Sequence, residues 1–264
     1  MTFAYETLKI EQKGHVVHLS VNRPDKLNAL NEKVLTELKD FLSLKIKELS
    51  GISGILLFGE GEKAFIAGAD IKAMQSMSPE QASEFARLGQ DVSLLFESID
   101  LPIIAAVDGF ALGGGCEMAM ACDMIYATEK SVFGQPEVNL GLIPGFGGTQ
   151  RLIKYVGRAR AKELIYTGRN IKASEGLDWG LVTRLFSSRE EMFENAIKTL
   201  DLIATKSPLI VGKCKQAINV SEGVSMATGL ELEREGFMSV FHTEDTKEGI
   251  NAFLEKRRPE FKNR

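Results

Sequence analysis

Three short apolar runs limit what this chain can fold into. They span residues 54–58, 102–107 and 124–127, and glycine, proline or aspartate bounds the first two. Such short runs, rich in Ile, Leu and Val, are typical of strands that a parallel sheet buries on both faces. Segments with helical periodicity separate them, so strand alternates with helix. This alternation predicts an α/β architecture with largely parallel sheets rather than a sandwich or a bundle.

The remaining pattern predicts a hairpin at the start and helices at the end. Two strand-like segments, 5–12 and 15–21, are separated by a Lys-Gly pair, which is typical of a tight turn. We expect one body with a core over residues 1–198 and a helical region over 199–264. The predicted helices cover residues 31–49, 79–99, 115–122, 189–205, 208–220, 224–241 and 243–256.

Composition excludes several classes of function. The 264 residues are 44% hydrophobic, which supports an extensive core, and the formal net charge is −4. Acidic and basic residues are mixed, so no overall positive field favours nucleic acid or an acidic membrane as a partner. No apolar run approaches the ~20 residues of a membrane-spanning helix. The first residues lack the pattern of a secretory or transit peptide, so we expect a cytoplasmic protein.

The cysteines and histidines do not predict a metal centre. Cys116, Cys122 and Cys214 form no CxxC pair, and no histidine near them completes a zinc site. We therefore expect them to be reduced core residues, and we expect the protein to bind no metal. The histidines are scattered along the chain, and packed or exposed roles are commoner than catalysis for such residues.

Two glutamates lie beside glycine in otherwise apolar stretches. Glu117 ends the run Leu-Gly-Gly-Gly-Cys-Glu, and Glu137 ends the run Phe-Gly-Gln-Pro-Glu. Burying a carboxylate without a partner is costly or raises its pKa, so two such residues indicate a functional site. Taken singly, Glu117 is also suited to interact with a helix dipole from the first turn, and Glu137 to be an ordinary loop residue.

Two backbone segments are suited to stabilise a negatively charged oxygen. The glycine run 113–115 precedes an apolar helix, where unpaired N–H groups point outward. Such a donor can contribute ~3–4 kcal/mol to a transition state that carries an oxyanion. The segment 67–69, Ala-Gly-Ala, also permits close backbone approach. Each segment also has a purely structural interpretation. The glycines could simply allow close packing where the helix begins. Residues 67–69 could form an ordinary turn in which Asp70 caps the next helix.

Five motifs in unbroken order resemble the enoyl-CoA hydratase/isomerase family, whose members are also called crotonases. The likeness continues into the tail, so it covers essentially the whole chain. It implies a crotonase-type spiral of strand-strand-helix repeats with a C-terminal helical trimerisation region, usually assembled as trimers or as hexamers made of two trimers. The motifs span residues 22–30, 64–72, 111–117, 133–137 and 141–150, and the tail match spans 248–257.

The resemblance also implies roles for individual residues. Ala69 and Gly114 match the two backbone donors of the family's oxyanion hole, and Glu117 and Glu137 match the two carboxylates of its hydratases. We predict that Glu117 helps to activate the attacking water and that Glu137 delivers the proton to C2, while a shared division of these tasks stays open. The reaction needs no metal or redox cofactor, because coenzyme A is part of the substrate.

Lysines and loops around this site are predicted to bind the acyl-CoA. In the family an early and a late lysine approach the nucleotide, the latter sometimes across a subunit boundary, which matches Lys26 and Lys256. The loop 141–148 has neither P-loop nor dinucleotide-binding spacing, and we expect it to bend beneath the acyl chain, with Phe146 shaping the pocket. The predicted substrate-binding residues are Lys26, Ala67, Gly68, Asp70, Ile71, Lys72, Gly113, Pro136, Gly145 and Lys256, and Arg23, Arg257 and Arg258 are further candidate cations.

The implied function is hydration of short trans-2-enoyl-CoA thioesters to 3-hydroxyacyl-CoA, or the reverse dehydration, in fatty-acid or butyrate-type lipid metabolism. Such an enzyme is a hydro-lyase. One alternative is an isomerase of the same family, which can work with a single carboxylate. Another is a non-enzymatic RNA-binding homologue, which would need a basic exposed helix. The predicted helix at 31–49 instead mixes lysine with glutamate and aspartate.

Overall fold

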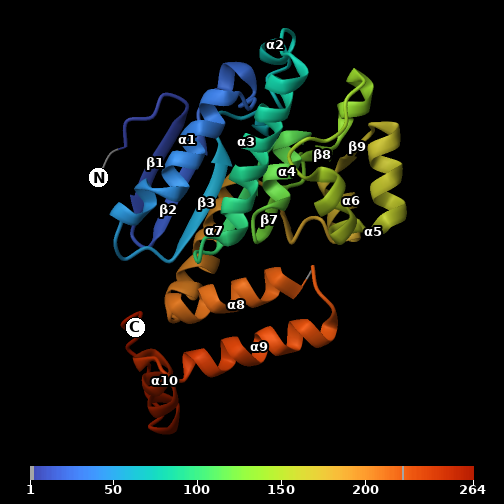
Figure 1. The fold of residues 1–264 in the computed structure, drawn as a ribbon. Coiled ribbons are helices and arrows are strands. Elements are labelled where there is room, and N and C mark those ends of the chain that lie inside the picture. The colour runs from blue at the N-terminus through green and yellow to red at the C-terminus, as the bar shows by residue number, and fades with distance from the viewer. Residues whose placement is uncertain (1–2, 222) are drawn as a thin grey trace.

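The apolar runs form neighbouring strands of one large sheet (Figure 1). The computed structural model describes residues 3–221 and 223–264. Strands β1 and β2 pair antiparallel as the predicted hairpin, and every later pair of this sheet is parallel, which confirms the α/β class. In spatial order the strands are β1 (Leu8–Lys13), β2 (Val16–Val21), β3 (Gly54–Gly59), β5 (Ile103–Val107), β7 (Met124–Thr128) and β10 (Arg184–Phe186).

A second sheet is built from much shorter strands. In spatial order they are β4 (Ala64–Ile66), β6 (Phe110–Leu112), β8 (Val132–Gly134) and β9 (Asn170–Lys172). From β3 to β8 the chain places successive strands alternately in the large and the small sheet, and helices return it to the next turn. This is the strand-strand-helix spiral that the family resemblance implies. The residue pattern alone does not predict the small sheet, because three-residue strands are too short to show a period.

Helices cover both faces of the large sheet. On one face α1 and α3 pack on each other over the main core, and on the other face α7 packs on β3, β5 and β7. Neighbouring residues of β3 show the division, because Leu57 belongs to the main core and Leu56 to the cluster beneath α7. The helices of the body are α1 (Glu32–Ser43), α2 (Ile71–Met74), α3 (Pro79–Ser98), α4 (Gly114–Met120), α5 (Gly148–Thr167), α6 (Ala173–Trp179) and α7 (Arg189–Ala204), with 3₁₀ turns η1 (Pro24–Lys26), η2 (Lys45–Glu48) and η3 (Pro136–Leu140).

Two details of the sequence prediction are wrong. The helix predicted over 31–49 ends at Ser43, and the separate turn η2 follows. The hydroxyl of Ser43 donates to the carbonyl of Lys39, and a bond of this kind competes with the helical ladder. Cys214 is exposed rather than part of the core, because α8 turns the side that carries Lys215 toward the body.

Three helices extend the chain beyond the sheets, as Figure 1 shows below the body. They are α8 (Pro208–Ser221), α9 (Met226–Val240) and α10 (Glu244–Leu254). Helix α9 packs against α8 but buries none of its residues. The predicted division at residue 198 falls inside α7, whose Leu200 still packs on the sheet. Among the described residues, no helix has the length and apolarity needed to cross a bilayer.

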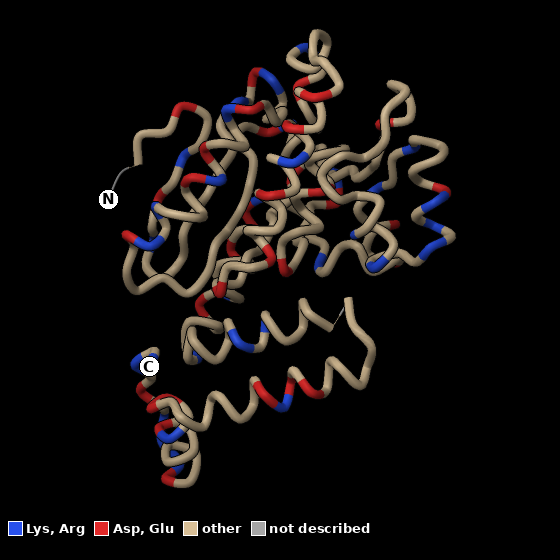
Figure 2. Tube along the Cα trace, in the orientation of Figure 1, with Lys and Arg blue, Asp and Glu red and all other residues tan. Residues whose placement is uncertain are grey.

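Acidic and basic segments are interspersed over the molecule, as Figure 2 shows. Helix α1 follows this pattern, because its lysines face carboxylates. Lys33 lies 3.3 Å from Glu37, and Lys39 lies 2.7 Å from Asp91 on α3. Within the described part of the chain, α1 therefore presents no continuous basic face of the kind that the RNA-binding alternative requires.

Candidate active site

Most of the predicted site residues converge on one cavity of about 460 Å³. It lies where the loops after β4, β6 and β8 meet the first half of α3. The predicted residues that line it are Ala67, Gly68, Ala69, Ile71, Gly113, Gly114, Glu117, Pro136, Glu137 and Gly145. Much of the remaining wall is apolar, which suits an acyl chain, and includes Met74, Ala82, Phe85, Ala86, Leu142 and Ile143.

Glu117 lies in the first turn of α4 and is only 1% exposed. Its Oε1 accepts hydrogen bonds from the backbone N–H of Phe146 at 2.8 Å and of Gly148 at 2.6 Å. Among the described residues, no side chain or backbone group bonds to its Oε2. Burial raises the pKa of Glu117, although the loop amides and the charge of Arg151 act in the opposite direction. The carboxylate thus has one anchored oxygen and one that is free to meet a ligand.

Glu137 lies in η3, directly after Pro136, and faces the same cavity. Its Oε1 lies over Gly113, where an added Cβ would be only 2.6 Å away. Its buried Oε2 finds no hydrogen-bond partner in the described part of the chain. Burial raises the pKa of Glu137 to about 7, and the negative charge of Glu117 contributes in the same direction. A carboxyl group with this pKa can hold or release a proton near neutral pH.

Two backbone N–H groups of the cavity wall are free to donate. In the bridge between Leu30 and Ala69, the bonds run from Leu30 N to Gly68 O and from Asp70 N to Leu30 O, both at 2.8 Å. The N–H of Ala69 is left over, and so is that of Gly114 at the start of α4. Neither has an acceptor among the residues that the structure describes. Both residues line the cavity, so the predicted pair of donors is brought together.

Gly115 allows this pair to form. A Cβ at this position would lie 1.9 Å from the carbonyl oxygen of Ile66, the last residue of β4. With glycine, α4 can approach the end of β4, and the segment that carries Ala69 comes to lie beside Gly114. The glycine run therefore has a packing role as well as the predicted chemical one.

A ring on the neighbouring loop fills a slot between α3 and α4. Phe146 lies against Gly114, where an added Cβ would be 3.0 Å from the ring, and against Gly89 of α3, where it would be 2.2 Å away. The ring also meets Phe85 edge-on at 5.3 Å between centroids. Because the N–H of Phe146 anchors Glu117, packing of this ring helps to set the position of the carboxylate.

Gly89→Ala is expected to displace the Phe146 ring. The ring is enclosed on several sides, so the added methyl overpacks the site and should lower stability by about 1–3 kcal/mol. It should also reduce any activity that depends on Glu117. Thermal unfolding and turnover of the variant test this. The matched control is Gly236→Ala, which adds the same methyl inside helix α9, where no described residue lies within 4 Å of it. Unchanged stability together with unchanged turnover in Gly89→Ala would contradict the packing argument.

The predicted polar contacts to substrate are distributed more widely. Asp70 occupies the N-cap position of α2 but accepts no cap hydrogen bond, and it pairs instead with Arg23 at 3.0 Å. Hydrogen bonding to Arg23 lowers the pKa of Asp70. Lys26 and Lys72 are both exposed, and Lys72 borders a groove next to the cavity. Lys256 follows α10, which lies at the opposite end of the molecule from α2 (Figure 1).

The sequence argument missed several contributors to the site. It assigned the loop 141–148 to the acyl chain, and residues of this loop line the cavity, but it did not foresee that the amides of Phe146 and Gly148 hold Glu117. It also overlooked Gln135, which is 1% exposed and has an Oε1 without a partner in the described residues. The only feature of the sequence that could have drawn attention to Gln135 was its place in the run Phe-Gly-Gln-Pro-Glu, two residues before Glu137. Within the described residues, no three His, Cys, Asp or Glu side chains gather in a way that could hold a metal ion.

The fold and the cavity together define a class of protein. Alternating strands of two sheets form a spiral. Its cavity combines two backbone amides that have no acceptor in the described residues with two carboxylates, of which Glu117 is buried and Glu137 half-buried. This is the crotonase architecture. A family model described as enoyl-CoA hydratase/isomerase matches residues 11–264. The chain belongs to the enoyl-CoA hydratase/isomerase family.

Individual relatives agree with this assignment. The chain is 45% identical to a short-chain-enoyl-CoA hydratase of Clostridium acetobutylicum, over 97% of each protein. It is 43% identical to a crotonyl-CoA hydratase of Syntrophomonas wolfei, over 98% of each. Among solved structures, enoyl-CoA hydratase from Bacillus anthracis superposes with a TM-score of 0.93 at 40% identity, covering 98% of this chain and all of the other.

Proposed function

We propose that this protein is an enoyl-CoA hydratase that adds water reversibly, in syn fashion, to short-chain trans-2-enoyl-CoA and gives 3-hydroxyacyl-CoA. The enzyme is a hydro-lyase. The observation that carries the proposal is the cavity in which Glu117 and Glu137 face two free backbone donors. The names of the relatives from Clostridium acetobutylicum and Syntrophomonas wolfei support a short acyl chain.

The geometry supports a division of labour at the reacting atoms. The thioester oxygen accepts from the N–H groups of Ala69 and Gly114, which makes C3 electrophilic and stabilises the enolate-like charge. Oε2 of Glu117 takes a proton from the attacking water, while the loop amides hold Oε1. Glu137, with its raised pKa, delivers a proton to C2. Dehydration follows the same path in reverse.

Hydration of crotonyl-CoA, followed by loss of the conjugated enoyl absorbance, tests the function directly. We expect turnover with the four-carbon substrate and a decline as the acyl chain grows. An isomerase would instead convert a 3-enoyl-CoA to the conjugated isomer and increase the absorbance. The presence of two carboxylates in one cavity favours hydration. Absence of turnover with every enoyl-CoA tested would refute the proposal.

We also propose that lysines bind the nucleotide of coenzyme A. Lys72 of α2 borders the groove next to the cavity, and Lys26 of η1 is near enough to Asp70, the residue before α2, for its charge to lower the pKa of that carboxyl group. Neither forms an ion pair that would occupy its charge among the described residues, so both ammonium groups are available to phosphate. Lys256 follows α10, at the opposite end of the molecule from α2. Its predicted contact with the nucleotide would therefore require the Lys256 of a second copy of the protein.

The enzyme is further proposed to be a homo-oligomer, a trimer or a dimer of trimers. Helix α9 supports this, because its apolar side chains remain exposed in the single chain, including Leu230, Phe237 and Met238. Sedimentation analysis is expected to show an assembly, and Phe237→Asp is expected to weaken it, because a charge would enter an apolar interface. A wild-type monomer at micromolar concentration would contradict the proposal.

A cytoplasmic location is also proposed. The likeness to bacterial hydratases over nearly their whole length supports it. Fractionation of the native cells, with antibody detection of the protein, provides the test, and recovery in the membrane or exported fraction would refute it.

A further inference from the structure

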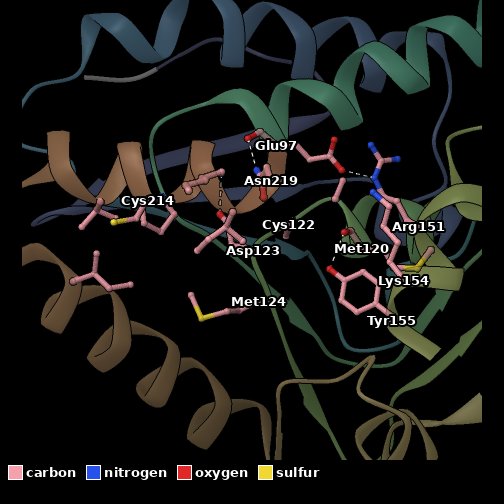
Figure 3. Close-up of a pocket in the computed structure, with 16 residues that line it drawn as sticks. Glu97, Met120, Cys122, Asp123, Met124, Arg151, Lys154, Tyr155, Cys214 and Asn219 are labelled. Carbon is pink, nitrogen blue, oxygen red and sulfur yellow. Dashed lines mark hydrogen bonds and ion pairs between the residues drawn. The ribbon is translucent and has the colours of Figure 1, made fainter. Parts of the chain in front are cut away.

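A second cavity, of about 430 Å³, lies between α5 and α8 and is separate from the one that holds the glutamates (Figure 3). Arg151 of α5 borders it and is largely buried, with 9% of its surface exposed. Its Nε donates to Oε1 of Glu97 on α3 at 2.6 Å. Its Nη1 donates to the carbonyl oxygen of Phe146 at 3.0 Å. Arg151 therefore connects α3 to the loop that holds Glu117.

The bond to the Phe146 carbonyl fixes the orientation of one peptide unit. In a trans peptide the C=O and the following N–H point in opposite directions. Because Arg151 holds the oxygen of the Phe146–Gly147 peptide on its own side, the N–H of Gly147 is directed away from Arg151. That N–H adds to the amides that lower the pKa of Glu117. The peptide thus presents a donor, rather than a carbonyl oxygen, to the carboxylate.

This loop needs such a constraint. Gly147 has a φ of +113°, a conformation that glycine enters and leaves without the cost other residues have. A rotated Phe146–Gly147 peptide would direct its carbonyl oxygen toward Oε1 of Glu117 and repel it. The space around Gly147 is also reserved for the guanidinium, because an added Cβ there would lie 2.1 Å from Nη1 of Arg151.

We infer that Arg151, held by Glu97, is a positioning residue for hydration: it fixes the Phe146–Gly147 peptide, so that the loop amides anchor Oε1 of Glu117 and leave Oε2 to the attacking water. The inference rests on the proposed hydratase function. Arg151 does not itself line the catalytic cavity, and it acts through its bond to the carbonyl of Phe146, which does.

A charge effect accompanies the geometric one. The charged groups that face Glu117 are Arg151 from α5 and Glu137 from η3. Loss of Arg151 removes a positive charge that lowers the pKa of Glu117, so this pKa rises. Glu117 must be ionised to accept a proton from water, and the acidic limb of the pH–rate profile should therefore move to higher pH.

The test compares Arg151→Gln, Arg151→Lys and Glu97→Gln with the wild-type enzyme. Arg151→Gln should lower kcat for crotonyl-CoA by about 100-fold, with KM changed far less, because misplacement of a catalytic group by about 1 Å has an effect of this size. Its acidic limb should move to higher pH, because the charge that lowers the pKa of Glu117 is gone. Arg151→Lys should recover part of the loss, since an ammonium group can reach the same carbonyl, and Glu97→Gln should show a smaller loss.

Lys215→Gln is the matched control. Lys215 is another buried cation of the second cavity, where it pairs with Asp123 at 2.9 Å and donates to the carbonyls of Phe96 and Leu101. Its loss should lower stability but leave the acidic limb in place. If Arg151→Gln keeps wild-type kcat, or if its pH profile moves no more than that of Lys215→Gln, the inference is overturned.

A second readout separates this inference from the proposed function. An infrared pH titration of the ligand-free protein follows the carboxyl band of Glu117, which is identified by its disappearance in Glu117→Gln. The pKa of this group should be higher in Arg151→Gln than in the wild type. A wild-type protein without hydratase activity refutes the proposed function, whereas an unmoved carboxyl titration refutes the role of Arg151.

Discussion

Glu117→Gln is expected to lower the rate of crotonyl-CoA hydration by about 10²–10⁴-fold. The amide has the same shape, and its oxygen can still accept from the N–H groups of Phe146 and Gly148, so the loop should stay in place. It cannot, however, take a proton from water. Steady-state kinetics measure the loss, and titration with butyryl-CoA measures binding, which should change by less than about threefold because the carboxylate is not a principal binding group.

Glu84→Gln is a suitable control for this experiment. Glu84 is an exposed residue of α3, the helix that borders the cavity, and the change removes the same charge without touching the site. It should keep wild-type turnover. If Glu117→Gln hydrates crotonyl-CoA at nearly the wild-type rate, Glu117 is not the base that activates water, even though it is buried in the cavity.

Glu137→Gln is expected to cause a comparable loss of hydration and, in addition, to change how stability depends on pH. Burial raises the pKa of Glu137 in the folded protein from 4.5 to about 7. Its contribution to stability is therefore fully present below about pH 4.5 and is lost as the pH rises through about 7. The amide does not ionise, so relative to the wild type the variant should gain about 1–2 kcal/mol between pH 5 and pH 8, after allowance for solvent screening.

Urea unfolding of both proteins at the two pH values measures this difference. Placing an amide in the pocket changes the unfolding free energy of the variant by the same amount at both pH values. This change therefore cancels when the two pH values are compared. If the difference in unfolding free energy between variant and wild type does not change with pH, Glu137 is not buried with a raised pKa. Full hydratase activity in Glu137→Gln would separately exclude it as the proton donor to C2.

The elements that the sequence predicts well are those whose signal is local. The apolar runs at 54–58 and 102–107 became strands of the large sheet, because a buried strand needs only a short continuous apolar stretch. Helix α3 was recognised from its proline and from Ser78, which forms a capping box with Gln81. The burial of Glu117 was foreseeable from its apolar neighbours.

What the sequence alone could not provide are contacts between distant segments. The amides of Phe146 and Gly148 reach Glu117 across about thirty residues of chain, and no local pattern marks them as its partners. The same holds for Arg151, whose guanidinium joins α5 to Glu97 on α3. In the small sheet, β4 and β6 are too short to show a period, and only the family resemblance implied them. Packing between turns of the spiral determines all of these features.

The alternation of strands between two sheets makes the site modular. Each of three consecutive short strands is followed by a different component: β4 by the donor Ala69, β6 by Gly114 and Glu117, and β8 by Glu137. Neighbouring strands of a sheet lie about 4.8 Å apart, and this spacing sets the distances between the components that follow the strands. A substitution after β8 can therefore change the proton chemistry while the pair of donors that polarises the thioester, supplied by the turns after β4 and β6, keeps its geometry.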